Sequence, residues 1–162
     1  MGALMRASGF LRVDGRWAYL DCGMGWYHYC LPELERRLWA DGRWVMVRDE
    51  ARRGSHDRGP ISPRLAYVPD GVVQPPTWGP HISIVRGENL TRPSQQMLAH
   101  AAAGWGKSFD FAITDPEIHK SPMSGHFFLR VKVPQLEELR VSLGLRPQPP
   151  VPWHLTIAVK QG

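Results

Sequence analysis

The sequence predicts an α+β fold with antiparallel-rich sheets and flanking helices. Segments rich in strand formers are interspersed with segments whose apolar residues recur at helical spacing, and most neighbouring strands are joined by loops or single helices. The composition is that of a globular domain, because 43% of the 162 residues are hydrophobic and 22% are charged. A chain of this length has a core of its own, and we expect a single domain over residues 1–162.

The strands are predicted from short runs of β-branched and aromatic residues bounded by turn-forming glycines and prolines. The clearest run is His-Ile-Ser-Ile-Val at 81–85. In chain order, the predicted strands are 16–22, 43–48, 65–68, 81–85, 108–113, 126–133 and 154–160.

Three helices are predicted from apolar stripes with start and stop signals. Leu31, Leu34 and Leu38 share one face of the first helix, and Pro32 lies near its first turn. Each of the other two has a proline near its start and a glycine after its end, as helices often do. The predicted helices cover 31–41, 91–103 and 134–143.

Residues 49–64 show no apolar periodicity and contain four arginines among glycines and prolines. This composition predicts a long loop. Because guanidinium groups bind phosphate oxygens in pairs, the loop is a candidate lid over an anionic substrate. A loop that is merely solvated is the alternative.

The charge favours an anionic partner. The net charge is +5, and sixteen of the twenty basic residues are arginine, which suits phosphate recognition. A GC-rich genome would also raise the arginine content. No apolar run approaches the roughly 20 residues that cross a bilayer, and the N-terminal segment does not resemble a secretory signal. We therefore expect a cytoplasmic protein without membrane contact and without an obligatory protein partner.

The two cysteines do not predict a metal site. Cys22 and Cys30 lie near Asp21 and His28, but their spacing matches none of the usual zinc patterns. We expect both thiols to be reduced, and we expect neither a metal nor a cofactor.

One pattern occurs twice in the chain, at 75–85 and 149–159. Each copy runs from a proline pair through a tryptophan into a histidine, an apolar residue, a hydroxyl residue and another apolar residue. Since residues i and i+2 of a strand share a face, His81 and Ser83 point one way and their apolar neighbours the other. The same holds for His154 and Thr156. If the two strands meet, the imidazoles converge on one cleft.

Two imidazoles and two hydroxyls suit phosphodiester cleavage. An imidazole, with an unperturbed pKa of about 6.5, can accept a proton from water or a ribose hydroxyl, while a second, protonated imidazole donates to the leaving oxygen. The hydroxyls of Ser83 and Thr156 can bind the non-bridging oxygens or orient the rings. This chemistry requires no metal. Taken alone, a His-x-Ser on a strand is more often a packed or surface histidine.

Four residues near the motifs are candidates for substrate binding. Arg86 has the opposite parity to the first histidine, but the strand can end directly after it. Lys160 has the parity of the second histidine, and a solvated lysine is the alternative. Trp78 and Trp153 precede the histidines and can stack a base, although core packing is the stronger interpretation of Trp153.

The motifs His81-Ile82-Ser83 and His154-Leu155-Thr156 resemble the paired His-x-Thr/Ser motifs of the 2H phosphoesterase superfamily. The resemblance covers residues 78–162 and implies a bilobal fold, with two antiparallel-rich sheets related by a pseudo-two-fold around a central cleft. It also implies metal-independent phosphodiester cleavage. Substrates in the superfamily include 2′,3′-cyclic phosphates, ADP-ribose 1″,2″-cyclic phosphate, 2′-5′ linked oligoadenylates and cyclic oligonucleotide signals. A phage or bacterial origin is part of what the resemblance suggests.

The function expected from these motifs is hydrolysis of a nucleotide, cyclic oligonucleotide or RNA-end phosphodiester, with His81 and His154 as the acid/base pair. One alternative is a module that binds an RNA end or cyclic nucleotide in the same cleft without turnover. Another is that both motifs belong to the core of a structural protein.

Overall fold

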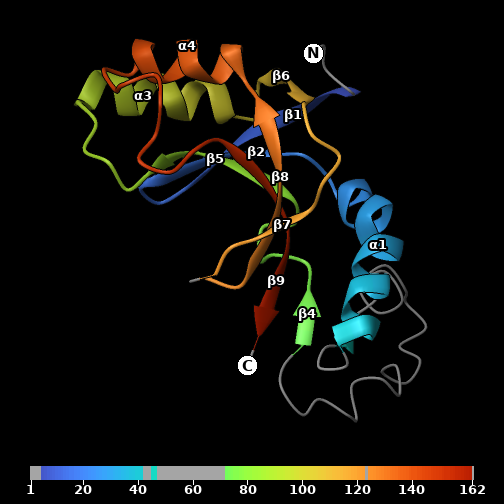
Figure 1. Ribbon diagram of the computed structural model, residues 1–162. Coiled ribbons are helices and arrows are strands. Elements are labelled where there is room, and N and C mark those ends of the chain that lie inside the picture. The colour runs from blue at the N-terminus through green and yellow to red at the C-terminus, as the bar shows by residue number, and fades with distance from the viewer. Residues whose placement is uncertain (1–4, 42–44, 47–71, 123, 162) are drawn as a thin grey trace. The chain divides into compact units, whose positions relative to one another are not determined.

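A computed structural model of the protein describes residues 5–41, 45–46, 72–122 and 124–161 (Figure 1). The fold is mixed α/β with a large antiparallel sheet, as the sequence predicts, and the described residues form three helices. None of these helices has the length and hydropathy needed to cross a bilayer. The contacts divide the chain into two compact units. Unit 1 comprises Met1–Gly23, His81–Glu117 and Leu129–Leu155, and unit 2 comprises Met24–Pro80, Ile118–Phe128 and Thr156–Gly162.

Unit 1 is built on an antiparallel sheet in the strand order β5-β2-β1-β6-β8. The part of the last strand that begins at Leu129 belongs to this unit. The strands are β1 (Met5–Asp14), β2 (Trp17–Asp21), β5 (His81–Arg86), β6 (Ser108–Ile113) and β8 (His126–Lys132).

Strand β1 was not predicted from the sequence, and it pairs with β2 in a hairpin. Two residues, Gly15 and Arg16, connect the strands, and Gly15 has a φ of 60°, which only glycine adopts without steric cost. Gly9 lies where β1 passes close to its neighbour, because a Cβ there would be 2.6 Å from the carbonyl oxygen of Asp21. Small and polar residues in the first half of β1 hide its strand character.

Helices α3 (Arg92–Ala102) and α4 (Pro134–Ser142) lie side by side over one face of this sheet (Figure 1). Thr91 caps α3 by accepting a hydrogen bond from the Ser94 amide, and the Ser94 hydroxyl donates to the Leu143 carbonyl after α4 at 3.2 Å. Apolar sheet residues are fully buried on alternate positions, and this burial drives the packing. They include Leu11, Ala18, Leu20, Ile82 and Ile84.

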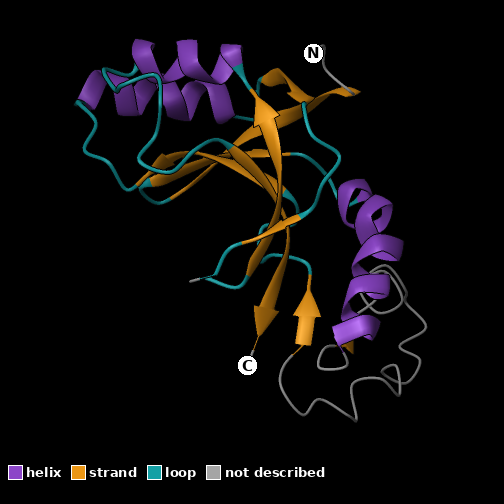
Figure 2. Ribbon diagram, viewed as in Figure 1, coloured by secondary structure: helices purple, strands orange, loops and turns teal. Residues whose placement is uncertain are grey.

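Unit 2 contains helix α1 and short strands. Strand β3 is parallel to β4. Strand β4 is antiparallel to β9, and their arrows point in opposite directions in Figure 2. Strand β7 pairs with the first residues of β8, and the part of β9 that begins at Thr156 belongs to this unit. The elements are α1 (Gly25–Asp41), β3 (Val45–Met46), β4 (Val72–Gln74), β7 (His119–Lys120) and β9 (His154–Gln161).

The first helix begins earlier than the sequence predicts. Tyr27, Cys30, Leu31 and Leu34 form its buried stripe, so an aromatic residue supplies the first position of the apolar face. Pro32 consequently lies inside the helix rather than in its first turn. The short strands β4 and β7 were not predicted, and the expected loop at 49–64 and strand at 65–68 lie outside the described residues.

Candidate active site

The first histidine motif lies on β5 and is opposed by β2. His81 is the cross-strand partner of Asp21, and Ser83 is the partner of Tyr19. Directly opposed residues share a face of a sheet, so these four side chains lie on one face. Between them Ile82 is fully buried, as the alternation in the sequence predicts. His81 is half-buried, and Ser83 has 7% of its surface exposed.

A bulge in β5 changes the side on which Arg86 lies. The register advances by two residues on β5, from Ser83 to Val85, while β2 advances by one, from Tyr19 to Ala18. Ile84 and Val85 are both buried, and Arg86 becomes the partner of Trp17. Because Trp17 and Tyr19 share a face of β2, the bulge places Arg86 on the face of Ser83, contrary to its sequence parity.

Arg86 is a partly buried cation with unused hydrogen-bonding capacity. Its Nε is buried and has no hydrogen-bond partner among the described residues. Desolvation by burial lowers the pKa of Arg86, and the positive charge of Arg140 lowers it further, whereas the Glu88 carboxylate raises it. Arg140 is already hydrogen-bonded to the Glu88 carboxylate, so the group that can still donate to an anion is the Arg86 Nε.

The second histidine begins β9. The Nδ1 of His154 lies 2.8 Å from the Pro152 carbonyl oxygen. A carbonyl only accepts hydrogen bonds, so Nδ1 carries the proton, and in the neutral ring Nε2 is the basic nitrogen. His154 and Leu155 belong to unit 1 together with β5, and β9 is next to β5 in the strand order. Leu155 is fully buried.

The other predicted site residues divide between the two units. Trp153 belongs to unit 1 and has 9% of its surface exposed, so it packs in the core, and its indole Nε1 has no hydrogen-bond partner among the described residues. Thr156 belongs to unit 2 and is buried. Trp78, also in unit 2, lies in the turn closed by the Gly79 amide and the Pro76 carbonyl at 2.8 Å. Lys160 pairs with Val73 through the backbone, and its side chain is outside the described set.

Three residues that the sequence does not single out form a connected group at the first histidine: Tyr19 and Asp21 lie opposite β5, and Arg12 contacts Asp21. The Tyr19 ring meets the His81 ring edge-on, with centroids 5.9 Å apart. The Asp21 carboxylate is 3.6 Å from Nε of Arg12, and Arg12 is the partner of Tyr19 on β1. The Gly15-Arg16 turn is a signal for part of this group, because glycine at the first of two turn residues is typical of a tight hairpin, and this hairpin sets Arg12 opposite Tyr19.

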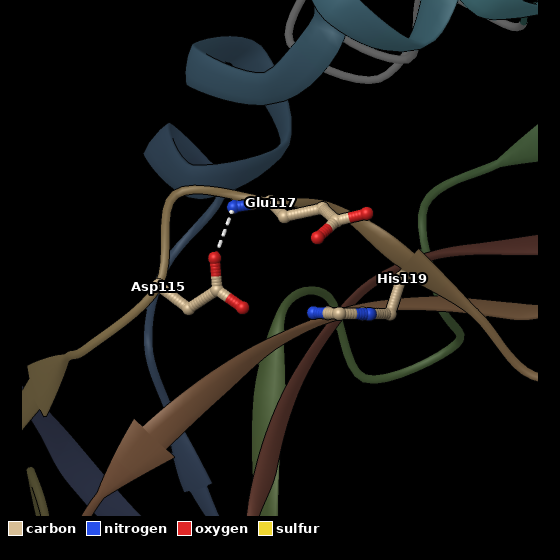
Figure 3. A group of neighbouring side chains, drawn as sticks. All are labelled: Asp115, Glu117 and His119. Atoms are coloured by element: carbon tan, nitrogen blue, oxygen red, sulfur yellow. Dashed lines mark hydrogen bonds between the residues drawn. The ribbon is translucent and has the colours of Figure 1, made fainter.

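Outside this face, Figure 3 draws three side chains of types that can bind a metal: Asp115 and Glu117 of unit 1 and His119 of unit 2. Asp115 accepts a hydrogen bond from the Glu117 amide at 2.9 Å, and the His119 ring stacks on Phe128 at 5.5 Å. Asp115 and His119 thus already make structural contacts within their own units, and Glu117 is exposed. We assign no metal to this group.

The cysteines have protonated thiols. Burial raises the pKa of Cys30 to about 11, and burial, followed by the charge of Asp21, raises the pKa of Cys22. A protonated thiol is a poor nucleophile and a poor metal ligand.

The candidate active site is therefore a face of unit 1 that carries His81, Ser83, Arg86 and Tyr19, with His154 at the start of the strand next in order. Comparison with protein families, with curated proteins and with solved structures finds nothing that matches this chain.

Proposed function

We propose that the protein is a phosphodiesterase that hydrolyses a nucleotide or oligonucleotide phosphodiester, with His81 and His154 as its acid/base pair. The proposed substrates are a 2′,3′-cyclic phosphate, an oligonucleotide with a 2′-5′ linkage, or a cyclic oligonucleotide. The proposal includes the bilobal 2H phosphoesterase-like fold predicted from the two motifs, and action in the cytoplasm.

One observation carries the proposal: the two histidines begin strands that are neighbours in the strand order, and both belong to unit 1. Buried Ile82 and Leu155 follow the histidines on their strands, so each ring is anchored by a core residue. Such anchoring holds a proton-transfer group in a fixed orientation.

The proposed reaction is attack of water on the phosphorus. One imidazole takes a proton from the water as the new P–O bond forms. The other, protonated, gives its proton to the oxygen that leaves as the old P–O bond breaks. For His154 the atom that exchanges the proton is Nε2, because Nδ1 donates to the Pro152 carbonyl. The Ser83 hydroxyl and the Arg86 guanidinium suit the non-bridging oxygens.

The test is hydrolysis of a panel of nucleotides by the wild type and by His81→Ala, His154→Ala and His100→Ala. The panel contains 2′,3′-cyclic mononucleotides, 2′-5′ linked diadenylate and cyclic di- and trinucleotides, each assayed with EDTA. His100 is an exposed histidine of α3 and serves as the control. We expect the first two variants to lose about 100-fold or more in kcat, and His100→Ala to match the wild type.

Two outcomes contradict the proposal. Full activity in both single variants of the motif histidines would show that neither transfers a proton. Binding of a panel member that is recovered intact after long incubation would instead support the alternative, a module that binds nucleotides without turnover. Circular dichroism of each variant separates loss of chemistry from loss of fold.

A further inference from the structure

A groove of about 580 Å³ lies in unit 1, between the hairpin β1–β2 and the end of α3. Small residues of the helix and of the turn after it leave room for a flat group. The residues that line it include Arg12, Tyr19, Ala99, Ala102, Gly104 and Trp105. We call it the Trp105 groove.

Trp105 is the most exposed of the large apolar residues that the structure describes, with 86% of its surface accessible. The turn that carries it is nevertheless well fixed. Lys107 donates its amide to the Ala101 carbonyl at 2.7 Å, and its carbonyl accepts from the Leu11 amide at 2.9 Å. Gly106 has a φ of 82°, and a Cβ there would lie 2.3 Å from the Leu11 carbonyl oxygen. A fixed turn that presents an indole ring to solvent suits recognition of a flat ligand.

Arg12 connects this turn to the candidate active site. Its Nη1 donates to the Trp105 carbonyl, and its Nε faces the Asp21 carboxylate at 3.6 Å. Tyr19 of β2, opposite Arg12, lines the groove. Its ring also meets the His81 ring edge-on, with the two ring centroids 5.9 Å apart. A ligand that lies against Tyr19 is therefore one side chain away from the first histidine.

We infer that the Trp105 groove binds the nucleobase of the substrate, stacked on the indole ring of Trp105, while the phosphate lies at His81. This inference rests on the proposed function and narrows its substrate class to phosphodiesters that carry a base. Stacking on an aromatic ring is tolerant of base identity, so the groove distinguishes nucleotides from other phosphate esters rather than one base from another. The Arg12 guanidinium favours an anionic ligand at the groove's edge.

The test is calorimetric titration with adenosine 5′-monophosphate and with ribose 5-phosphate, which lacks the base. The variants are Trp105→Ala, Trp105→Phe and the control Met97→Ala. Met97 is an exposed apolar residue of α3, with 42% of its surface accessible, and it does not line the groove. We expect Trp105→Ala to bind the nucleotide about ten-fold or more weakly, with little change for ribose 5-phosphate. Trp105→Phe should stay close to the wild type because it keeps a ring to stack on.

Wild-type affinity of Trp105→Ala for adenosine 5′-monophosphate would overturn the inference, as would a failure of the wild type to bind it. Turnover of the cyclic nucleotides by the same variants separates this result from the proposed function. If Trp105→Ala turns over the cyclic nucleotides and binds adenosine 5′-monophosphate as the wild type does, the proposed enzyme activity is supported and the role of the Trp105 groove is contradicted. If Trp105→Ala binds the nucleotide more weakly but the wild type shows no turnover, nucleobase binding in the groove is supported and the proposed enzyme activity is contradicted.

Discussion

At the scale of single residues, the first histidine is held from two directions. Its strand neighbour Ile82 is buried in the core of unit 1, and its ring meets Tyr19 at an interplanar angle of 76°. An edge-to-face contact of this kind restricts rotation of both rings. In the proposed enzyme, Tyr19 is therefore a positioning residue for His81.

We predict that Tyr19→Phe keeps kcat within about three-fold of the wild type, while Tyr19→Ala lowers it by ten- to a hundred-fold. Phenylalanine preserves the ring contact, whereas alanine frees the imidazole, and small misplacements of a reacting group are costly. The pKa of Tyr19 is raised, first by burial and then by the charges of Asp21 and Asp14. The phenol therefore stays protonated below about pH 10, and the pH profile of Tyr19→Phe should match that of the wild type over that range.

Steady-state kinetics from pH 5 to 9 on all three proteins measures this effect. Equal losses in Tyr19→Phe and Tyr19→Ala would contradict a role that depends on the ring alone, and would point to the hydroxyl instead. Tyr29→Ala is a suitable control, because Tyr29 is an exposed tyrosine of α1 with 66% of its surface accessible.

At the scale of elements, the bulge in β5 decides on which face of the sheet Arg86 lies. Without the extra residue, Arg86 would follow the alternation from His81 and lie on the buried face. With it, Arg86 opposes Trp17 on the face of Ser83. Its burial without a partner for Nε is costly for stability, and a cost of this kind is expected at a binding residue.

We predict that Arg86→Met raises KM about ten-fold or more without lowering the melting temperature. A hydrogen bond to a charged group contributes about 1.5–3 kcal/mol, which substrate binding loses in this variant. Stability does not fall, because methionine removes a buried Nε that has no hydrogen-bond partner among the described residues, and this gain offsets the lost attraction to Glu88. Arg92→Met, at an exposed position of α3, is the matched control. A variant that unfolds at lower temperature and keeps its KM would show that Arg86 is structural.

The bulge also shows what the sequence can and cannot predict. The alternation in His81-Ile82-Ser83 predicts both the strand and the face of its side chains, because burial of one face leaves a period of two. The insertion of one residue at Ile84 leaves no trace in the pattern, since Ile84 and Val85 are equally apolar. Parity therefore failed for Arg86, at the point where a partner strand decides the register.

Strand β1 was missed for a related reason. Gly9 is required by the close approach of β1 to Asp21, and glycine in a strand weakens the strand signal. The glycine of the Gly15-Arg16 turn was the remaining indication. Without β1, Arg12 could not be placed opposite Tyr19. Tyr19 and Asp21 lie on β2, which was predicted, but the sequence does not show that β2 pairs with β5, so they were not grouped with His81. The sequence likewise does not indicate Trp105 as a binding residue, because the groove that it lines is formed by residues far apart in the chain.

At the scale of the whole molecule, the chain carries an excess of positive charge, but the buried arginine Arg140 is paired with a carboxylate. The net charge is +5, yet Arg140 of α4 has 1% of its surface exposed. Its two terminal nitrogens donate to the two carboxylate oxygens of Glu88 at 2.7 and 2.8 Å, and the remaining donors reach the carbonyls of Ile84 and Arg146, each at 2.7 Å. This network fastens α4 to the strand that carries His81.

Among the described residues, Glu88 is the carboxylate to which Arg140 is bonded, so its loss leaves this buried cation without that counter-charge. We predict that Glu88→Gln lowers the free energy of unfolding by about 1.5–3 kcal/mol at pH 7, the contribution of hydrogen bonds to a charged group. The Glu88 side chain is 24% exposed, which keeps the loss below that of a fully buried ion pair. The control Glu138→Gln lies at an exposed position of α4, the helix that carries Arg140. It should change the free energy of unfolding by less than about 0.5 kcal/mol.

The pH dependence of this difference gives the sharper test. The hydrogen bonds from Arg140 are the main cause that lowers the pKa of Glu88 in the folded protein. A carboxyl group whose folded pKa is depressed contributes its full stability above the unfolded pKa of about 4.3, and loses that contribution as the pH falls through the folded value. The gap between wild type and Glu88→Gln should thus stay constant from pH 7 to about 5 and shrink below about 4. Urea unfolding followed by tryptophan fluorescence measures the gap, and a gap that widens in acid would contradict the assignment of Glu88 as the counter-charge of Arg140.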